Sequence, residues 1–88
     1  MKNVIRVKRE HIQSGNPKSR CECAIGLALS DCGFDHLDIG LNIMRIGGAI
    51  FKTPKALMEF QKLGLEGKRH LQRSTRFKVS DLKLLGMQ

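Results

Sequence analysis

Residues 21–32 read Cys-Glu-Cys-Ala-Ile-Gly-Leu-Ala-Leu-Ser-Asp-Cys, and no other part of the chain constrains the architecture as strongly. This stretch contains the longest apolar run in the sequence, with no charged residue between Cys23 and Leu29. Ile25, Ala28 and Leu29 recur at helical spacing, while Ala24 and Leu27 widen the apolar face. We therefore predict a core helix that other elements cover on more than one side.

Both ends of this stretch carry helix-boundary signals. Ser19 and Glu22 have the spacing of a capping box, in which each side chain accepts a hydrogen bond from the other residue's backbone N–H. Gly33 has the position of a C′ residue, which often adopts the left-handed conformation, and Phe34 can then pack against the last turn. The helix is therefore expected to begin after Ser19 and to end at Gly33.

Alternating apolar residues predict the strands around this helix. Residues 3–9 form a first strand, with Ile5 and Val7 facing the core and with Arg6 and Lys8 on the opposite side. A loop is expected at 10–18 and a second strand at 37–41. Two apolar runs, 43–46 and 49–52, flank Gly47-Gly48 and predict a β-hairpin.

The remaining third of the chain predicts a helix, a basic connector and a last strand. Thr53 is a candidate N-cap before Pro54 at the first helical position, and the helix is expected to end at Gly64 or Gly67. A basic connector follows at 68–75. The last strand is expected at 76–79 and a short terminal turn or tail at 81–88. The inner face of the helix is expected to carry Leu57, Phe60 and Leu63 or Gly64, and the last strand to turn Phe77 and Val79 inward.

This order of elements predicts an α+β class. We expect one domain over residues 1–80, built as a sandwich of two helices on one face of a four- or five-stranded antiparallel or mixed sheet. A ferredoxin-like split βαβ arrangement is the nearest named architecture. In that arrangement the first and last strands are neighbours.

Composition restricts the class of protein. The chain has 88 residues, is 41% hydrophobic and has no apolar run of the roughly 18 residues that span a bilayer. We therefore expect a soluble globular protein that stays in the cytoplasm where it is made. Cys21, Cys23 and Cys32 are an odd number with unsuitable spacing for a pair within one helix, so we expect reduced thiols.

Catalytic and metal chemistry have little support in the sequence. A thiol of Cys21 or Cys23 could pair with His11 as a nucleophile and base, and Cys32 and His36 have a spacing that zinc ligands can use. Buried thiols and ordinary loop histidines explain these residues more simply. We predict a protein that is not an enzyme and that has no metal or cofactor.

The charge of the chain is strongly basic and uneven. The net charge is +8, with an excess of three positive charges in 1–34, none in 35–67 and five in 68–88. Neighbouring first and last strands would place Arg6 and Lys8 across from Arg76 and Lys78. Like charges that face each other across strands destabilise a sheet, so a polyanionic partner is indicated. The predicted binding residues are Arg6, Lys8, Lys68, Arg69, Arg73, Arg76 and Lys78.

The motifs His11-Ile12, Gly15 and 23–29 resemble those of small uncharacterised bacteriophage and prophage accessory proteins. Those proteins open with a strand and a glycine loop before a cysteine-led Ala-Ile-Ala-Leu-Ala-Leu helix, and they continue through a hairpin to a second helix. Gly26 stands where an alanine is usual in that group. The resemblance implies a phage accessory protein that acts in a bacterial cytoplasm, and it supplies no catalytic residues.

Two functions fit these observations. In the first, the protein binds the phosphate backbone of nucleic acid without reading its sequence. The sequence has no Trp or Tyr, and its four phenylalanines are expected in the core, so aromatic base stacking is not expected. In the second, the protein is a phage inhibitor of a host defence complex, CRISPR-like, or of a transcription complex, and it binds a protein or nucleoprotein surface.

Overall fold

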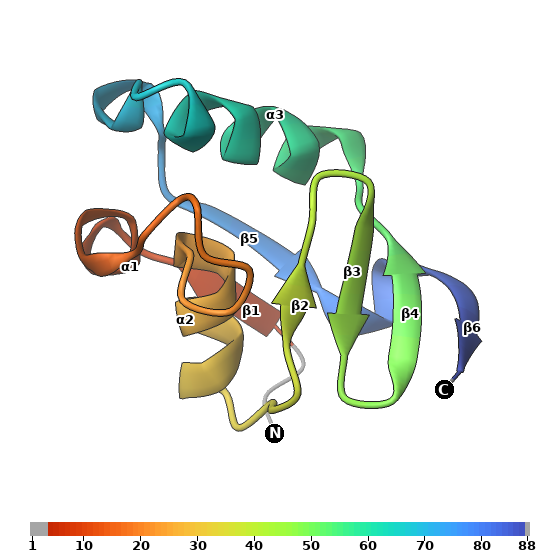
Figure 1. Cartoon of the computed structure of the whole chain (residues 1–88). Helices are drawn as coiled ribbons and strands as arrows, with labels where there is room; N and C mark the ends of the chain where they lie inside the picture. The colour runs from red at the N-terminus through yellow and green to blue at the C-terminus, as the bar shows by residue number, and fades with distance from the viewer. Residues whose placement is uncertain (1–3, 88) are drawn as a thin grey trace.

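Three α-helices and two antiparallel sheets make up residues 4–87, the part of the chain that this computed structural model describes (Figure 1). The small α+β class predicted from the sequence is confirmed. Asn3, assigned above to the first strand, and Gln88 lie outside the described residues. The elements in chain order are β1 (Val4–Val7), α1 (Arg9–Ser14), α2 (Ala24–Asp31), β2 (Asp38–Ile39), β3 (Ile43–Ile46), β4 (Ala49–Lys52), α3 (Lys55–Leu65), the 3-10 helix η1 (Arg69–Leu71), β5 (Thr75–Lys78), the 3-10 helix η2 (Val79–Asp81) and β6 (Lys83–Met87).

The strands divide into two sheets rather than the single sheet expected. β1 and β5 form a two-stranded ribbon, while β2, β3, β4 and β6 form a four-stranded sheet in that order. The predicted pairing of the first strand with the strand after the basic connector is correct. The split βαβ arrangement is wrong because β1 pairs with β5 alone, in a ribbon separate from the sheet of β2, β3 and β4. The outer edge of β4 is paired with β6. The sequence had assigned the residues of β6 to a terminal turn or tail.

The helix α2 begins later than its capping signal indicated. Its N-cap is Cys23, whereas the Ser19 hydroxyl accepts the backbone N–H of Glu22 at 2.9 Å in a turn that precedes the helix. The C-terminal prediction is correct. Gly33 has a φ of 93°, its N–H donates to the Ser30 carbonyl, and the N–H of Phe34 donates to the Leu29 carbonyl. These two bonds are those of a Schellman motif.

Burial of α2 follows the predicted pattern with one exception. Ile25 and Leu29 are fully buried, and the helix contacts α1, β1 and β2, so it is covered on several sides as expected. Leu27 is only half-buried. Gly26 is buried because the backbone of Cys21 lies directly against it: a Cβ atom there would lie 2.3 Å from the Cys21 carbonyl oxygen. The predicted helix core is therefore correct, with Leu27 at its margin.

Residues 10–14 of the predicted loop at 10–18 belong to α1, which begins at Arg9, a residue assigned above to the first strand. His11 occupies the third helical position, and its Nδ1 accepts the backbone N–H of Lys8, the N-cap residue, at 2.9 Å. A capping box usually places Glu or Gln at this position. A helix of six residues has too few turns to show an apolar repeat, which explains why the pattern of residues did not reveal it.

The helix α3 packs its predicted face inward. Leu57, Phe60 and Gly64 are buried, as expected. Its N-cap is Pro54 rather than Thr53. Thr53 is 1% exposed, and its hydroxyl donates to the carbonyl of Gly40 at 3.1 Å, so this side chain ties the start of α3 to the loop after β2.

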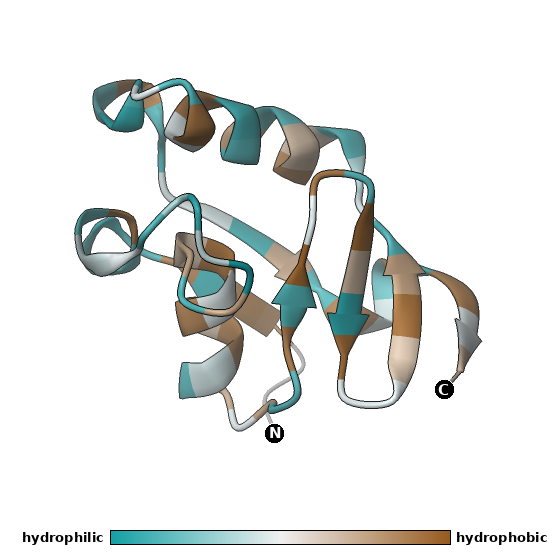
Figure 2. Cartoon of the chain, viewed as in Figure 1, coloured by the Kyte–Doolittle hydropathy of each residue, from teal (hydrophilic) through white to brown (hydrophobic). Residues whose placement is uncertain are grey.

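One core joins the two sheets and the three helices (Figure 2). Ile5 and Val7 of β1 and Met44 of β3 are fully buried within it. Phe77 and Val79 pack against it as predicted. Leu82 is also buried and lies between η2 and β6, so it fixes the turn that carries the chain from the ribbon to the outer edge of β4.

Candidate nucleic-acid interface

Arg6 and Arg76 are direct partners across β1 and β5. Both are exposed, because Ile5 and Val7 take the inward positions of β1 and the side chains alternate along the strand. Within residues 4–87 neither arginine forms an ion pair. Two guanidinium groups therefore share one exposed patch of the ribbon without a neutralising carboxylate bonded to either.

A hollow with a volume of about 320 Å³ lies beside this pair, and we name it the Arg6 hollow. Three of its side chains are cationic and two carry hydroxyl groups, while none carries a carboxylate. Cationic groups and hydroxyl donors are the usual protein contacts of a phosphate oxygen. Its lining residues are Arg6, Val7, Lys8, Ser74, Thr75 and Arg76.

Lys8 is held at this hollow by a buried histidine. The Nδ1 atom of His11 accepts the backbone N–H of Lys8, so the ring proton lies on Nε2, which donates to Asp31 Oδ2 at 2.6 Å. His11 is 6% exposed, whereas the Asp31 side chain is 71% exposed. The pair thus connects the start of α1 to the end of α2 and fixes the backbone that carries the Lys8 side chain.

A second hollow, of about 380 Å³, adjoins the first, and we name it the Lys78 hollow. The two share Arg6 and Arg76. Lys78 does not face Lys8 as predicted: its partner is Val4, because the antiparallel register places Lys8 and Lys78 at opposite ends of the ribbon. The lining residues of this hollow are Val4, Arg6, Arg76, Phe77, Lys78 and Asp81.

The basic connector contributes less to this surface than the sequence suggested. Arg69 turns toward α1, where its Nη2 donates to the carbonyl of Gly15 at 2.8 Å and its Nη1 to that of Gln13 at 3.5 Å. Lys68 Nζ lies 3.6 Å from Glu66 Oε1. Neither lines a hollow of the ribbon. Arg73 is exposed and immediately precedes Ser74, at the edge of the Arg6 hollow.

Sequence reasoning missed three residues of this surface. Ser74 and Thr75 contribute hydroxyl groups to the Arg6 hollow, and Asp81 contributes the carboxylate of the Lys78 hollow. Ser and Thr are frequent in connectors of every kind. Only the register of β1 against β5 shows that Ser74 and Thr75 lie beside Arg6 and Lys8. The position of the Asp81 side chain depends on the path of η2, and the sequence did not predict that 3-10 helix.

One aromatic side chain, that of Phe77, borders this surface in the lining of the Lys78 hollow. Phe51 and Phe60 are buried, and Phe34 and Phe77 are partly buried against the same core. This placement agrees with the sequence prediction. Base stacking on an aromatic platform therefore has no candidate residue among the exposed side chains of residues 4–87.

The candidate thiol–histidine pair is not assembled. Burial raises the pKa of the Cys23 thiol, which favours the protonated form, and both ring nitrogens of His11 have partners. All three cysteines are free. Cys21 and Cys23 precede α2, so the helical argument against their pairing does not apply to them. Among the described residues, no cluster of His, Cys, Asp or Glu is suited to hold a metal ion.

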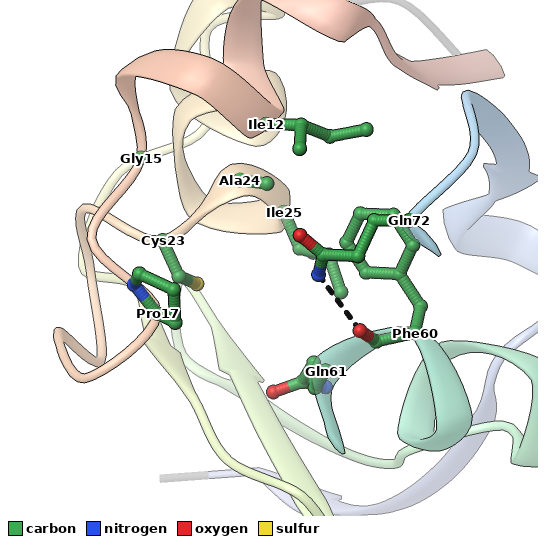
Figure 3. A pocket seen from close by; sticks show the side chains of 9 residues that line it. All are labelled: Ile12, Gly15, Pro17, Cys23, Ala24, Ile25, Phe60, Gln61 and Gln72. Atoms are coloured by element: carbon green, nitrogen blue, oxygen red, sulfur yellow. Dashed lines mark hydrogen bonds between the residues drawn. The ribbon is translucent and has the colours of Figure 1, made fainter. Parts of the chain in front are cut away.

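Cys23 lines a small, partly open space of about 20 Å³ between α1, α2 and α3 (Figure 3). Gln72 also lines it and donates from Nε2 to the Phe60 carbonyl at 2.8 Å. This volume corresponds to about one water molecule. The space is a packing feature of the core and is too small for a cofactor.

Comparisons with known proteins found no protein-family model, curated protein or solved structure that matches this chain. Within residues 4–87, none of the helices has both the length and the apolar character needed to cross a membrane.

Proposed function

We propose that this protein is a non-enzymatic nucleic-acid-binding protein that contacts the phosphate backbone without reading sequence. The observation that carries the proposal is the Arg6 hollow, where three cations, two of them a like-charged pair, meet two hydroxyl groups with no carboxylate in the lining. A bound phosphate would offset the repulsion between Arg6 and Arg76. In the unliganded protein, no carboxylate of residues 4–87 forms an ion pair with either arginine to offset this repulsion.

The side chains on this surface favour backbone contact over base recognition. Arginine and lysine bind phosphate oxygens on any sequence, whereas sequence readout needs a helix or strand that enters a groove, or aromatic rings on which bases stack. A two-stranded ribbon can enter the major groove, but the exposed side of this four-residue ribbon carries cations and hydroxyl groups and no Asn or Gln to pair with adenine, and the phenylalanines pack against the core. The protein is therefore expected to bind unrelated sequences with similar affinity.

The proposal of a non-catalytic role rests on His11 and Cys23. A general base needs an unoccupied nitrogen, and both nitrogens of His11 are engaged. A nucleophilic thiol needs a lowered pKa, and burial shifts the pKa of Cys23 in the opposite direction. The resemblance of the segment 11–29 to phage accessory proteins further suggests that binding takes place in a bacterial cytoplasm.

Fluorescence anisotropy with labelled oligonucleotides tests this proposal. Single- and double-stranded probes of several unrelated sequences should bind with closely similar affinities within each class. A ribbon variant should lose affinity for every probe by a similar factor, while a control variant with the same change in charge should lose much less. The ribbon variant is Arg6→Gln, Lys8→Gln and Arg76→Gln; the control variant is Lys18→Gln, Arg45→Gln and Lys62→Gln.

Two outcomes would contradict this function. A probe preference that exceeds tenfold between unrelated sequences of one class would indicate readout of the bases. Failure of the wild type to bind any probe at moderate salt would favour the alternative of an inhibitor that binds a host protein or nucleoprotein surface. A pull-down from bacterial lysate, with and without nuclease, separates these cases, because a protein partner retained after nuclease treatment supports the inhibitor.

A further inference from the structure

Three lysines that the sequence did not single out gather around a third hollow. Lys52 and Lys83 are direct partners across β4 and β6, and Lys55 is the first residue of α3. The hollow has a volume of about 570 Å³ and we name it the lysine hollow. Its lining residues are Lys52, Thr53, Pro54, Lys55, Met58, Asp81 and Lys83.

Three lysines share this hollow with one carboxylate, that of Asp81, so its lining carries a net positive charge. Lys52 and Lys83 repeat on the four-stranded sheet the like-charged pairing of Arg6 and Arg76 on the ribbon. Within residues 4–87 none of the three lysines forms an ion pair. Lys55 stands in the first turn of α3, where a positive charge opposes the helix dipole. An anion in the hollow would compensate all of these repulsions.

The lysine hollow is continuous with the candidate interface. Asp81 lines both the lysine hollow and the Lys78 hollow. The chain enforces this adjacency, because β5 ends at Lys78, η2 ends at Asp81 and β6 begins at Lys83. Leu82, which lies between η2 and β6, is buried and anchors the backbone where the chain passes from the ribbon to the four-stranded sheet. Three hollows therefore follow one another across the surface, each sharing at least one wall residue with the next.

We infer that the three lysines of the lysine hollow bind further phosphate groups of the same nucleic-acid strand, so that the interface extends from the ribbon past η2 onto the four-stranded sheet. This inference rests on the proposed function. It identifies the ligand as a strand long enough to reach both like-charged pairs. It also gives Asp81 a role, because among residues 4–87 its carboxylate is the one negative charge in the lining of the Lys78 hollow and the lysine hollow.

Oligonucleotide length gives the first test. Wild-type affinity for a graded series of oligothymidylates, from the dinucleotide upward, should rise in two stages, as first one and then both groups of cations are reached. The lysine variant, Lys52→Gln, Lys55→Gln and Lys83→Gln, should lose the second stage and keep the first. The control variant defined above, with the same change in charge, should keep both. Melting curves verify that every variant folds.

The salt dependence on a long single strand gives the second test. The lysine variant loses three phosphate contacts, each of which contributes about 0.7 on a single strand, so its slope of log affinity against log salt should be smaller by about 2. The Asp81→Asn variant should bind more tightly than the wild type. The control Asp35→Asn, at an exposed acid that lines neither of these hollows, should gain less.

The outcomes separate the two proposals. If the wild type binds and the lysine variant keeps the slope and the length dependence of the control, the extended interface is wrong, whereas the ribbon site is unaffected. If the wild type binds no probe, both proposals are wrong. A reduced slope together with a lost second stage, in the lysine variant alone, supports the extended interface.

Discussion

Arg6 and Arg76 face each other directly across the antiparallel strands β1 and β5, and neither has an acidic partner among the described residues. Directly opposed side chains in such a pair have Cβ atoms about 5 Å apart, so two like charges at these positions reduce the stability of the ribbon. The repulsion persists in the free protein and would be relieved by a bound anion. This relationship connects the stability of the fold to its proposed function.

Removal of this repulsion should stabilise the free protein. The double variant Arg6→Gln, Arg76→Gln should raise the free energy of unfolding by a few tenths of a kcal/mol, measured by urea denaturation at low salt. Either single variant should give most of the gain, because one substitution already breaks the pair. Arg45→Gln is the control: Arg45 faces Asp38, so its loss should be neutral or slightly destabilising. A double variant less stable than the wild type would contradict the repulsion.

Gly26→Ala should destabilise the protein although alanine is the better helix former. Alanine normally gains about 1 kcal/mol over glycine within a helix. Here the new Cβ would lie 2.3 Å from the Cys21 carbonyl oxygen, and this backbone cannot yield as a flexible side chain can. Overpacking of this kind costs about 1–3 kcal/mol, so we expect net destabilisation in thermal or chemical unfolding. An unchanged or higher stability would mean that the segment before α2 is free to move.

Arg69 should contribute to stability more than to binding. Its guanidinium bonds to the carbonyls of Gly15 and Gln13, more than fifty residues away in sequence, and so joins the connector to the end of α1. Arg69→Gln should lower the free energy of unfolding by about 1 kcal/mol, because the site is exposed and the hydrogen bonds compete with water. Arg73→Gln, at an exposed neighbour, should leave stability unchanged. A strong loss of nucleic-acid affinity from Arg69→Gln, with unchanged stability, would show that Arg69 belongs to the binding surface.

Cys23 should make the fold sensitive to alkaline pH. Burial raises the pKa of this thiol in the folded state, whereas in the unfolded state it stays near the ordinary value of about 8.5. The folded state therefore retains a proton that the unfolded state loses, and stability should decline as the pH rises above that value. Cys23→Ala should reduce this decline, and Cys21→Ala, at an exposed thiol, should not. An identical decline in stability at alkaline pH in the wild type and in Cys23→Ala would show that the Cys23 thiol is not its cause.

The sequence predicted the elements whose signals are local. The core helix, its end at Gly33, the Gly47-Gly48 hairpin and the inner face of α3 all depend on residues within a few turns of one another, and the structure confirms them. Sequence patterns failed to predict the features that depend on contacts between residues far apart in the chain. Ser19 has the side chain of a helix cap, yet the backbone after it bonds elsewhere: the Arg20 carbonyl accepts the N–H of Ile39, and α2 begins only at Ala24.

The same limit applies to the candidate interface. Alternation along β1 and β5 correctly predicted that Arg6 and Arg76 lie on the exposed side of one ribbon. The lysine hollow depends on β6, whose residues contain three apolar side chains and a glycine that suggested no partner. Pairing with β4 brings Lys83 opposite Lys52, and no pattern within either segment reveals that long-range register.

A salt titration of the wild type, the ribbon variant and the control variant tests the central claim most directly. On one single-stranded probe, the slope of log affinity against log salt should fall by about 2 when Arg6, Lys8 and Arg76 become Gln, since each lost phosphate contact removes about 0.7 from the slope. The control variant should keep the wild-type slope. Equal slopes for all three proteins would show that the Arg6 hollow does not contact phosphate and would contradict the proposed interface.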